Sequence, residues 1–563
     1  MRILVAFLFV TVSVHAVDLE SWSPFGIGAC HINNRSAKDN ERWVPQMEEI
    51  GLRVFRTPQL NWGAVEPEPG VWKWDQLDEQ MDYLSEHGFT FGGTLIGNPR
   101  WNDKDERGSL PVNNLKGWSA YVTAVVKHVN GRIKRWEIWN EPPNFTGKDQ
   151  TPADYAKIVI AAHDAAKAVD PDCKIGLAAK SVHIHYLEQV IQAGGRDHFD
   201  FITLHPYEVL NGIVDNAGTE SVFMHIVPTL RKMLAIQNPA KADVPVIFTE
   251  LGSNANKGEG PQAQSLIKAY TLGIAQGVEC IQWFEGRDGD SGPLGLLDRE
   301  GHPRLSFHAM KHLIKHLGQH PKYLGWCLLN GKHYAFAFEG AEGPVLITWA
   351  HGCESDEVAF GKVVTLVELV SGDRIDVDHH FLTSAAILVL APPQSLLEAA
   401  KLHRDQPLTW DGDYSQVKEV CITMGEADGE KGLHTLSGSS LADAVVAYGG
   451  SARAGNVPGG NLFVVDPEFL AYTTVPIEIE VVVRRNEAND KAGFKLVYES
   501  KDGFKTAGGW FTIPDNTQWH TQRWRIDDPQ FVSYWGYNFS LVSDGDVFNR
   551  YLIQRVTVRK LEE

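Results

Sequence analysis

Between about residues 24 and 318, short apolar runs alternate with longer amphipathic stretches. Eight such pairs follow one another in strict order, as in repeated βα units. Eight units favour an α/β fold of the closed (β/α)8 barrel type, the TIM barrel, over an open sheet. The predicted strands are 25–30, 53–57, 90–96, 135–139, 174–178, 199–204, 244–249 and 279–284. The predicted helices are 40–50, 76–87, 115–129, 153–169, 184–193, 220–236, 262–275 and 305–317.

After residue 318 the helical period gives way to short β-rich runs at 334–338, 344–349, 363–368 and 385–390. These runs predict a small β-sandwich over 319–395, which follows the predicted catalytic barrel over 17–318. A segment with a short helical pattern, 396–417, reads as a linker. From 418 to 563 the chain is β-rich again, and residues 477–481 alternate apolar and acidic side chains. This last part predicts a second β-sandwich or jelly roll with one buried and one wet face.

The first 16 residues have the pattern of a signal peptide. One positive charge, Arg2, precedes an apolar run over 3–14, and the small residue Ala16 marks the cleavage position. A buried N-terminal strand is the alternative reading. A signal peptide implies a secreted or periplasmic protein, and no later apolar run reaches the 18 residues of a membrane span.

The composition of the chain disfavours several classes of binding partner. The 52 Lys and Arg residues stand against 71 Asp and Glu residues, so the net charge of −19 disfavours nucleic acid and anionic membranes. The six cysteines show no CxxC pair and no zinc-ligand spacing, so no metal site is expected. An exported chain could oxidise a pair such as Cys327 and Cys353, a connectivity that the sequence leaves open.

Two carboxylates follow predicted barrel strands at the edge where such barrels place their active sites. Glu141 comes after the fourth strand, in Trp139-Asn140-Glu141-Pro142, and Glu250 comes after the seventh, in Thr249-Glu250. Cleavage of a glycosidic bond needs one group to protonate the leaving oxygen and another on the opposite side of the sugar. Two carboxyl groups at strand ends can do both.

With these motifs, residues 24–318 resemble the clan A retaining glycoside hydrolases, a group of (β/α)8 barrels that includes families 5 and 39. The resemblance implies that Glu141 is the general acid/base and Glu250 the nucleophile. The Glu-Ile-Trp-Asn-Glu-Pro motif with a following small β-domain resembles family 39. His205-Pro206-Tyr207 and the strand-seven motif also suit family 5. No cofactor or metal is implied, and the implied partner is a carbohydrate substrate.

The same resemblance assigns helpers around the carboxylates. Asn140 would bond the sugar 2-hydroxyl, and Arg56 would hold the nucleophile ionised. His205 and Tyr207 match a strand-six pair, with the tyrosine hydroxyl near the nucleophile. Trp283, at the end of strand eight, would form the aromatic floor of the subsite that holds the attacked sugar.

Each assignment has an alternative. The two glutamates could be rim carboxylates in ion pairs, His205 a core histidine, and Arg56 a structural partner. Glu137 lies deeper on the fourth strand, which favours a buried salt bridge over catalysis. The strand-end aromatic residues could line sugar subsites or belong to the core; they are Trp62, Trp101, Trp139 and Tyr207.

The aromatic-rich C-terminal domain could bind carbohydrate or serve only structure. Its aromatic residues are Trp510, Trp519, Trp524, Tyr534, Trp535 and Tyr537. The predicted function is a secreted retaining glycoside hydrolase that cleaves β-glycosidic bonds by double displacement. A transglycosylase would carry the same residues, whereas a non-catalytic carbohydrate-binding protein is expected to lose Asn140 or one of the two glutamates.

Overall fold

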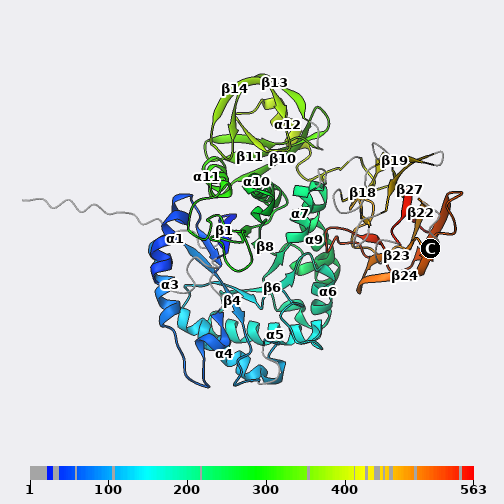
Figure 1. Ribbon diagram of the computed structural model, residues 1–563. Helices are drawn as coiled ribbons and strands as arrows, with labels where there is room; N and C mark the ends of the chain where they lie inside the picture. Colours follow the sequence, from blue (N-terminus) through cyan, green and yellow to red (C-terminus); the bar gives the residue numbers. More distant parts are fainter. Residues whose placement is uncertain are drawn as a thin grey trace, which may run out of the picture.

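Eight parallel strands close into a barrel, which confirms the predicted fold class. The pairing runs β1-β2-β4-β5-β6-β7-β8-β9 and returns from β9 to β1 (Figure 1). The computed structural model describes residues 22–28, 37–56, 60–103, 108–215, 219–351, 355–410, 412–424, 429–436, 444–447, 450–455, 461–486, 491–543 and 548–562. The predicted signal peptide, 1–16, and Cys353 lie outside the described residues.

The barrel strands are short and buried, and most are flanked by helices, as parallel strands require. The strands are β1 (Phe25–Gly28), β2 (Val54–Arg56), β4 (Thr90–Ile96), β5 (Arg135–Ile138), β6 (Lys174–Lys180), β7 (Phe201–His205), β8 (Val246–Leu251) and β9 (Cys280–Trp283), with a two-residue β3 (Leu60–Asn61) beside the end of β4. The helices are α1 (Ala37–Glu49), α2 (Trp62–Val65), α3 (Asp75–Glu86), α4 (Leu115–Val129), α5 (Pro152–Val169), α6 (Ile184–Gln192), α7 (Tyr207–Asp215), α8 (Glu220–Met224), α9 (Ile226–Gln237), α10 (Glu259–Ala275) and α11 (Leu305–Leu317). Short 3-10 turns occupy η1 (Val112–Asn114), η2 (Gly195–Asp197), η3 (Pro239–Lys241) and η4 (Ala255–Lys257).

The helix predicted over 220–236 is wrong as a single element, because the chain breaks into α8 and α9 at His225. Pro228 has no amide hydrogen, so it cannot continue a helical bond from the preceding turn. It fits instead in the first turn of α9, where amide hydrogens have no helical partner.

A six-stranded antiparallel sheet, in the order β10-β11-β12-β15-β13-β14, follows the barrel and encloses its own apolar core together with helix α12. The predicted linker 396–417 is therefore shorter than expected, because Leu397 and Ala400 of α12 are buried in that core. The elements are β10 (Lys322–Leu329), β11 (His333–Gly340), β12 (Gly343–Thr348), β13 (Asp356–Glu368), β14 (Arg374–Leu382), β15 (Ile387–Leu390) and α12 (Gln394–Leu402).

The C-terminal part is a sandwich of two antiparallel sheets with a common apolar core. The seven-stranded sheet contains β16 (Glu419–Thr423), β17 (Gly429–Lys431), β19 (Ala444–Ala447), β20 (Gly450–Ala454), β22 (Ile477–Arg485), β25 (His520–Ile526) and β27 (Tyr551–Lys560). The five-stranded sheet contains β18 (Leu433–Thr435), β21 (Asn461–Val465), β23 (Gly493–Ser500), β24 (Gly503–Thr512) and β26 (Phe539–Val542).

On β22 the apolar residues of the predicted alternation are buried in this core. The acidic face is not uniformly wet, because Glu480 is only 2% exposed. The guanidinium groups of Arg523, Arg555 and Arg559 cover its carboxylate. Ion pairing thus replaces solvent at this position.

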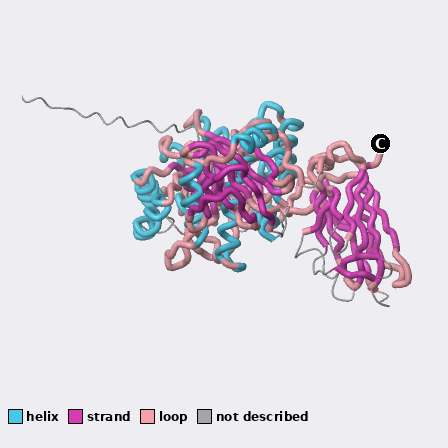
Figure 2. Tube along the Cα trace, turned by 90° about the horizontal axis from the view of Figure 1, so that it is seen from above, coloured by secondary structure: helices cyan, strands magenta, loops and turns pink. Residues whose placement is uncertain are grey.

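The sandwich packs beside the barrel, next to α6, α7 and α9 (Figures 1 and 2). His225 bonds Glu468 at 3.0 Å, and Lys232 donates to the Ala471 carbonyl oxygen at 2.7 Å. Among the described residues, no helix is both long and apolar enough to cross a membrane.

Candidate active site

Glu141 and Glu250 meet at the carboxyl-end mouth of the barrel, where β5 and β8 end. Their side chains are 17% and 13% exposed, so both are enclosed and still reachable. One oxygen of each carboxylate and one ring nitrogen of His205 all lie within 4.8 Å of one another. Two carboxylates and a histidine therefore face a single point in the mouth.

The backbone after β5 turns sharply to present this motif. Trp139 and Glu141 both have left-handed backbone angles, with φ of 69° and 47°. Such angles cost non-glycine residues about 1–3 kcal/mol and persist only where the surroundings impose them. Here the Trp139 amide donates to the Leu95 carbonyl at 2.8 Å, and its indole donates to the Phe145 carbonyl at 2.9 Å.

A polar layer beneath the mouth supports both glutamates. Glu137 is 4% exposed and accepts hydrogen bonds from the Arg56 guanidinium at 2.6 and 3.0 Å. The hydroxyls of Thr94, Thr203 and Thr249 also donate to Glu137, at 3.1, 2.6 and 2.7 Å. Burial raises the pKa of Glu137, but the charges of Arg56 and His205 and these hydrogen bonds outweigh it and hold the pKa below its usual range. The buried salt bridge expected for Glu137 is present.

Arg56 links this layer to the carboxylate at the top of β8. Its Nη1 donates to Oε1 of Glu250, and its Nη2 donates to the Asn140 side-chain oxygen at 2.7 Å. A charge-assisted bond of this kind stabilises an ionised carboxylate. Holding the Asn140 oxygen leaves the amide Nδ2 as the donor for a ligand.

The Tyr207 hydroxyl donates to the other oxygen of Glu250 at 3.2 Å. Burial, followed by the charges of Glu250 and Glu141, raises the pKa of Tyr207 far above its ordinary value. The phenol therefore keeps its proton and remains a donor, as expected for the strand-six pair.

His205 connects Glu141 to the polar layer. Its Nδ1 lies 2.9 Å from Oε1 of Glu141, and its Nε2 lies 3.0 Å from the Thr249 hydroxyl. That hydroxyl donates its single hydrogen to Glu137, so Nε2 must carry a hydrogen of its own. The remaining proton lies between Nδ1 and Glu141, and the two groups share it.

Electrostatics place the shared proton nearer the ring when no substrate is bound. Burial lowers the pKa of His205, but the charge of Glu250 and the bond to Glu141 outweigh it and raise the pKa above its ordinary value. Burial raises the pKa of Glu141, yet His205, Lys180 and Arg56 together lower it below the ordinary value. The two shifts describe one coupled pair rather than two independent groups.

Trp283, expected as the floor of the subsite, is fully buried and cannot contact a ligand in this structure. Gln282 lines the barrel interior together with Arg56 and Glu137. Side chains alternate along a strand, so Trp283 points outward to the helices and Phe284 points inward again. Phe284 is half-buried and packs edge-to-face on Tyr207, with ring centroids 6.4 Å apart. The aromatic residue of this strand end is therefore Phe284, one position beyond the prediction.

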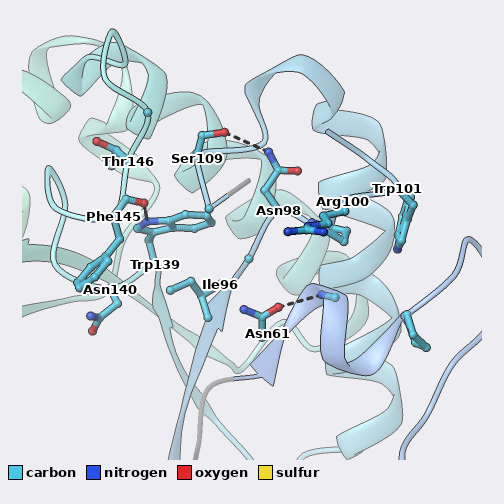
Figure 3. Close-up of a pocket in the computed structure, with 16 residues that line it drawn as sticks. Asn61, Ile96, Asn98, Arg100, Trp101, Ser109, Trp139, Asn140, Phe145 and Thr146 are labelled. Carbon is cyan, nitrogen blue, oxygen red and sulfur yellow. Dashed lines mark hydrogen bonds between the residues drawn. The ribbon is translucent and has the colours of Figure 1, made fainter. Parts of the chain in front are cut away.

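A cavity of about 1100 Å³ opens beside Asn140, over the ends of β3, β4 and β5 (Figure 3). Trp101 and Trp139 line it, whereas Trp62 lies in the barrel core behind Trp101. The cavity is slightly larger than the usual range for ligand sites, about 300–1,000 Å³. Its further polar and aromatic lining includes Asn61, Asn98, Arg100, Ser109, Phe145 and Thr146.

Lys180 ends β6 beside the turn that carries Glu141, and it was not among the residues predicted from the sequence. Its amide donates to the Pro142 carbonyl at 3.1 Å, and its charge acts on Glu141. Its place at the end of the fifth barrel strand could have identified it as a candidate site residue. Phe145 was missed because it lies in a loop, outside any periodic pattern.

Within the described part of the chain, three groups of His, Asp and Glu residues come close enough to hold a metal ion, and one of them is Glu141, His205 and Glu250. At that site Arg56 already supplies a positive charge to Glu250. The arrangement therefore needs no metal to balance its carboxylates.

Comparison with known proteins gives partial matches. The glycosyl hydrolase family 10 model matches residues 27–179, a segment that contains Glu141 but not Glu250. Beta-galactosidase Bga of Halorubrum lacusprofundi is 32% identical over 63 residues, which is 11% of this chain and 9% of that protein. Endo-1,4-beta-xylanase A of Phanerodontia chrysosporium is 28% identical over 130 residues, which is 21% of this chain and 30% of that enzyme. The chain thus matches less than a third of either relative's length.

A solved family 39 glycoside hydrolase from the gut symbiont Bacteroides cellulosilyticus WH2 shares the fold, with a TM-score of 0.56 at 18% identity. The match covers 66% of this chain and 81% of that one. The matches touch more than one family of clan A and place the chain in none of them. The barrel therefore has the fold of the clan A glycoside hydrolases.

Proposed function

We propose that this chain is a secreted retaining glycoside hydrolase that cleaves β-glycosidic bonds of an oligo- or polysaccharide by double displacement. The observation that carries the proposal is the pair Glu141 and Glu250, with carboxylate oxygens within 4.8 Å of each other. Carboxyl groups about 5–5.5 Å apart suit retention, whereas inversion needs roughly 6.5–9.5 Å to admit a water molecule.

In the first step Glu250 attacks the anomeric carbon while the bond to the leaving oxygen breaks. Arg56 and Tyr207 hold the attacking carboxylate in place, one on each oxygen. The leaving oxygen takes the proton that Glu141 shares with His205, so the departing sugar leaves as a neutral alcohol. Asn140 offers its Nδ2 to the sugar hydroxyl next to the reacting carbon.

In the second step Glu141 acts as a base. It removes a proton from water, the oxygen of that water bonds to the anomeric carbon, and Glu250 departs as a carboxylate. The proton then returns to the His205–Glu141 pair. The pair thus holds one proton before and after the full cycle, which matches the hydrogen-bond pattern around Thr249.

The cavity beside Asn140 supports an extended substrate, because about 1100 Å³ exceeds the space that one sugar ring fills. Its half-buried Trp101 and exposed Phe145 suit the apolar faces of sugar rings. The partial relatives named above, a beta-galactosidase and an endo-1,4-beta-xylanase, are consistent with a β-linked glycan.

A reducing-sugar screen across plant and algal polysaccharides tests the activity. Glu141→Gln and Glu250→Gln should abolish turnover of any substrate found, while Glu49→Gln should not, because Glu49 is an exposed residue paired with Lys311. Full activity in either of the first two variants would refute the assignment. Added sugar acceptors decide between hydrolysis and transglycosylation.

Export is part of the proposal and rests on the pattern of residues 1–16. Expression of the full chain in a secreting host, followed by N-terminal sequencing, should show cleavage near Ala16. Retention of the uncleaved chain inside the cell would contradict export without touching the catalytic assignment.

A further inference from the structure

A buried carboxylate in the C-terminal sandwich shapes the loop that follows β25. Glu499 is fully buried, and its oxygens accept hydrogen bonds from the backbone amides of Val532, Ser533 and Tyr534 at 2.9–3.1 Å. The Asn538 side-chain amide donates to it as well, at 3.0 Å. A single charged group thus fixes the path of residues 532–538, which carry Tyr534, Trp535 and Tyr537.

This loop is seated on the barrel at the ends of β6 and β7. The Ser181 hydroxyl lies 2.8 Å from the Tyr534 carbonyl oxygen, and His185 bonds the Gln530 side chain at 2.6 Å. Gly536 has a φ of 79°, and a Cβ atom there would lie 3.3 Å from the Glu208 carbonyl oxygen. The fit is therefore tight, and Val532 and Tyr534 belong to the same continuous apolar core as the barrel.

The loop also reaches the neighbourhood of the acid/base residue. The Lys180 ammonium lies over the Trp535 ring at 4.8 Å from its centroid, and the Lys180 amide bonds Pro142, directly after Glu141. Ser181 forms a backbone bridge with His205. After burial, the charges of Glu208 and Glu141 are the main causes that raise the pKa of Tyr534. Trp535 itself is half-buried, and its ring centroid lies 4.4 Å from that of Tyr534.

Around the barrel mouth, Glu141, which follows β5, has a different feature of the structure on each side. The cavity beside Asn140 lies over β3, β4 and β5, and Asn140 itself lines it, so the role of Asn140 at the 2-hydroxyl puts the attacked sugar on this side. Lys180 and Trp535 lie on the other side, over β6 and β7. The leaving group bonded to the oxygen that Glu141 protonates must extend away from the attacked sugar, toward this second side.

We propose that Trp535, supplied by the C-terminal sandwich, is a specificity-determining residue that stacks on the sugar of the leaving group. The inference rests on the proposed function, since it assigns a role beside Glu141. On this account the sandwich is a built part of the catalytic cleft rather than a tethered binding module. The flat indole, backed by the Lys180 ammonium, suits the apolar face of a sugar ring, and Lys180 can donate to its hydroxyls.

The test compares an oligosaccharide with a glycosyl fluoride of the same sugar. One pair is xylotriose and β-xylosyl fluoride, and the other pair is cellotriose and β-glucosyl fluoride. Fluoride is a one-atom leaving group that cannot reach Trp535. We expect Trp535→Ala to lower kcat/KM for the oligosaccharide by about tenfold or more and to leave kcat/KM for the fluoride within about twofold. Trp535→Phe, which keeps a ring, should recover most of the loss.

The control variant Phe381→Ala removes a 62% exposed aromatic side chain of β14, in another domain, and should change neither rate. Equal losses on both substrates, or no loss on the oligosaccharide, would overturn the role of Trp535 while the glycosidase proposal stands. If the wild-type protein cleaves neither the fluorides nor the glycans of the screen, the proposed function itself fails.

A second variant reaches the same loop from within the sandwich. Glu499→Gln keeps the size of the side chain but places an NH2 group against backbone amides, which loosens the loop. We expect the same selective loss on the oligosaccharide, with cleavage of the fluoride retained. Unchanged kinetics in a folded Glu499→Gln protein would refute the view that this carboxylate positions Trp535.

Discussion

Replacing His205 with asparagine isolates the shared proton at the active site. In the wild-type protein the raised pKa of His205 keeps one proton on the His205–Glu141 pair at pH values above the ordinary histidine value of about 6.5. The acid function is therefore present up to the raised pKa of the pair, which lies above the ordinary histidine value, and it is lost as the pH rises through that pKa. In His205→Asn the proton must reside on Glu141 alone, whose ordinary value is about 4.3.

The size of the effect follows from this difference. The two ordinary values lie about two pH units apart, equivalent to about 3 kcal/mol. Burial raises the pKa of Glu141 and so reduces this difference, whereas the raised pKa of His205 in the wild-type protein increases it. We expect the alkaline limb of kcat/KM to move toward acid pH by one to two units, with a loss of about 10- to 100-fold at pH 7 that is largely recovered near pH 5.

The assay is kcat/KM against pH for a sugar leaving group and for a 2,4-dinitrophenyl leaving group. The second needs little protonation, so its alkaline limb should hardly move. His302→Asn serves as control, because His302 is exposed and its ring bonds Asp298 rather than either glutamate of the pair. An unchanged alkaline limb in His205→Asn would refute the shared-proton account, and equal shifts for both leaving groups would point to a structural effect.

Three further predictions concern the groups around the pair. Glu141→Gln should lower kcat/KM for sugar leaving groups by about 10²–10⁴-fold. Pre-steady-state kinetics should show that the bond-breaking step with 2,4-dinitrophenyl glycosides is spared, and equal losses for both leaving groups would contradict the role of Glu141 as acid. Arg56→Met should destabilise the barrel by about 3–5 kcal/mol in urea unfolding, because it strands the 4% exposed Glu137 carboxylate; a loss below about 1 kcal/mol would contradict this. Trp283→Ala should cost about 3–5 kcal/mol of stability, whereas Phe284→Ala should mainly raise KM; the reverse pattern would restore Trp283 as the sugar platform.

Most of the fold could be predicted from the periodic pattern of apolar and polar residues. Alternating apolar runs and amphipathic stretches were enough to predict the barrel, because each strand is buried on both faces and most are followed by a helix with one apolar face. The break at His225 was missed, since the apolar period continues across it while Pro228 alone marks the new start. Local backbone chemistry, rather than hydrophobicity, decided that boundary.

The site was predictable as far as strand ends define it. Glu141, Glu250, Arg56, His205 and Tyr207 all lie at barrel strand ends, and the structure brings them together. The aromatic residue was misplaced by one position, because a strand's last inward residue depends on register, which sequence alone does not give.

The contact between the sandwich and the mouth was not predictable. Trp535 is more than 350 residues from Lys180 in the chain, and no periodic pattern links the two. The aromatic residues of the C-terminal domain suggested either a binding face or a core. In the structure Trp524 packs in the sandwich core, while Tyr534 and Trp535 lie against the barrel.

Covalent trapping of the nucleophile tests the central claim most directly. A 2-deoxy-2-fluoro glycoside of the preferred glycone should inactivate the protein, because the fluorine slows release of the glycosyl–enzyme ester. Peptide mass spectrometry should then find one sugar attached to Glu250, and none in the Glu250→Gln variant. A label on Glu141, or an inverted anomer as the first product of an unlabelled substrate, would contradict the account.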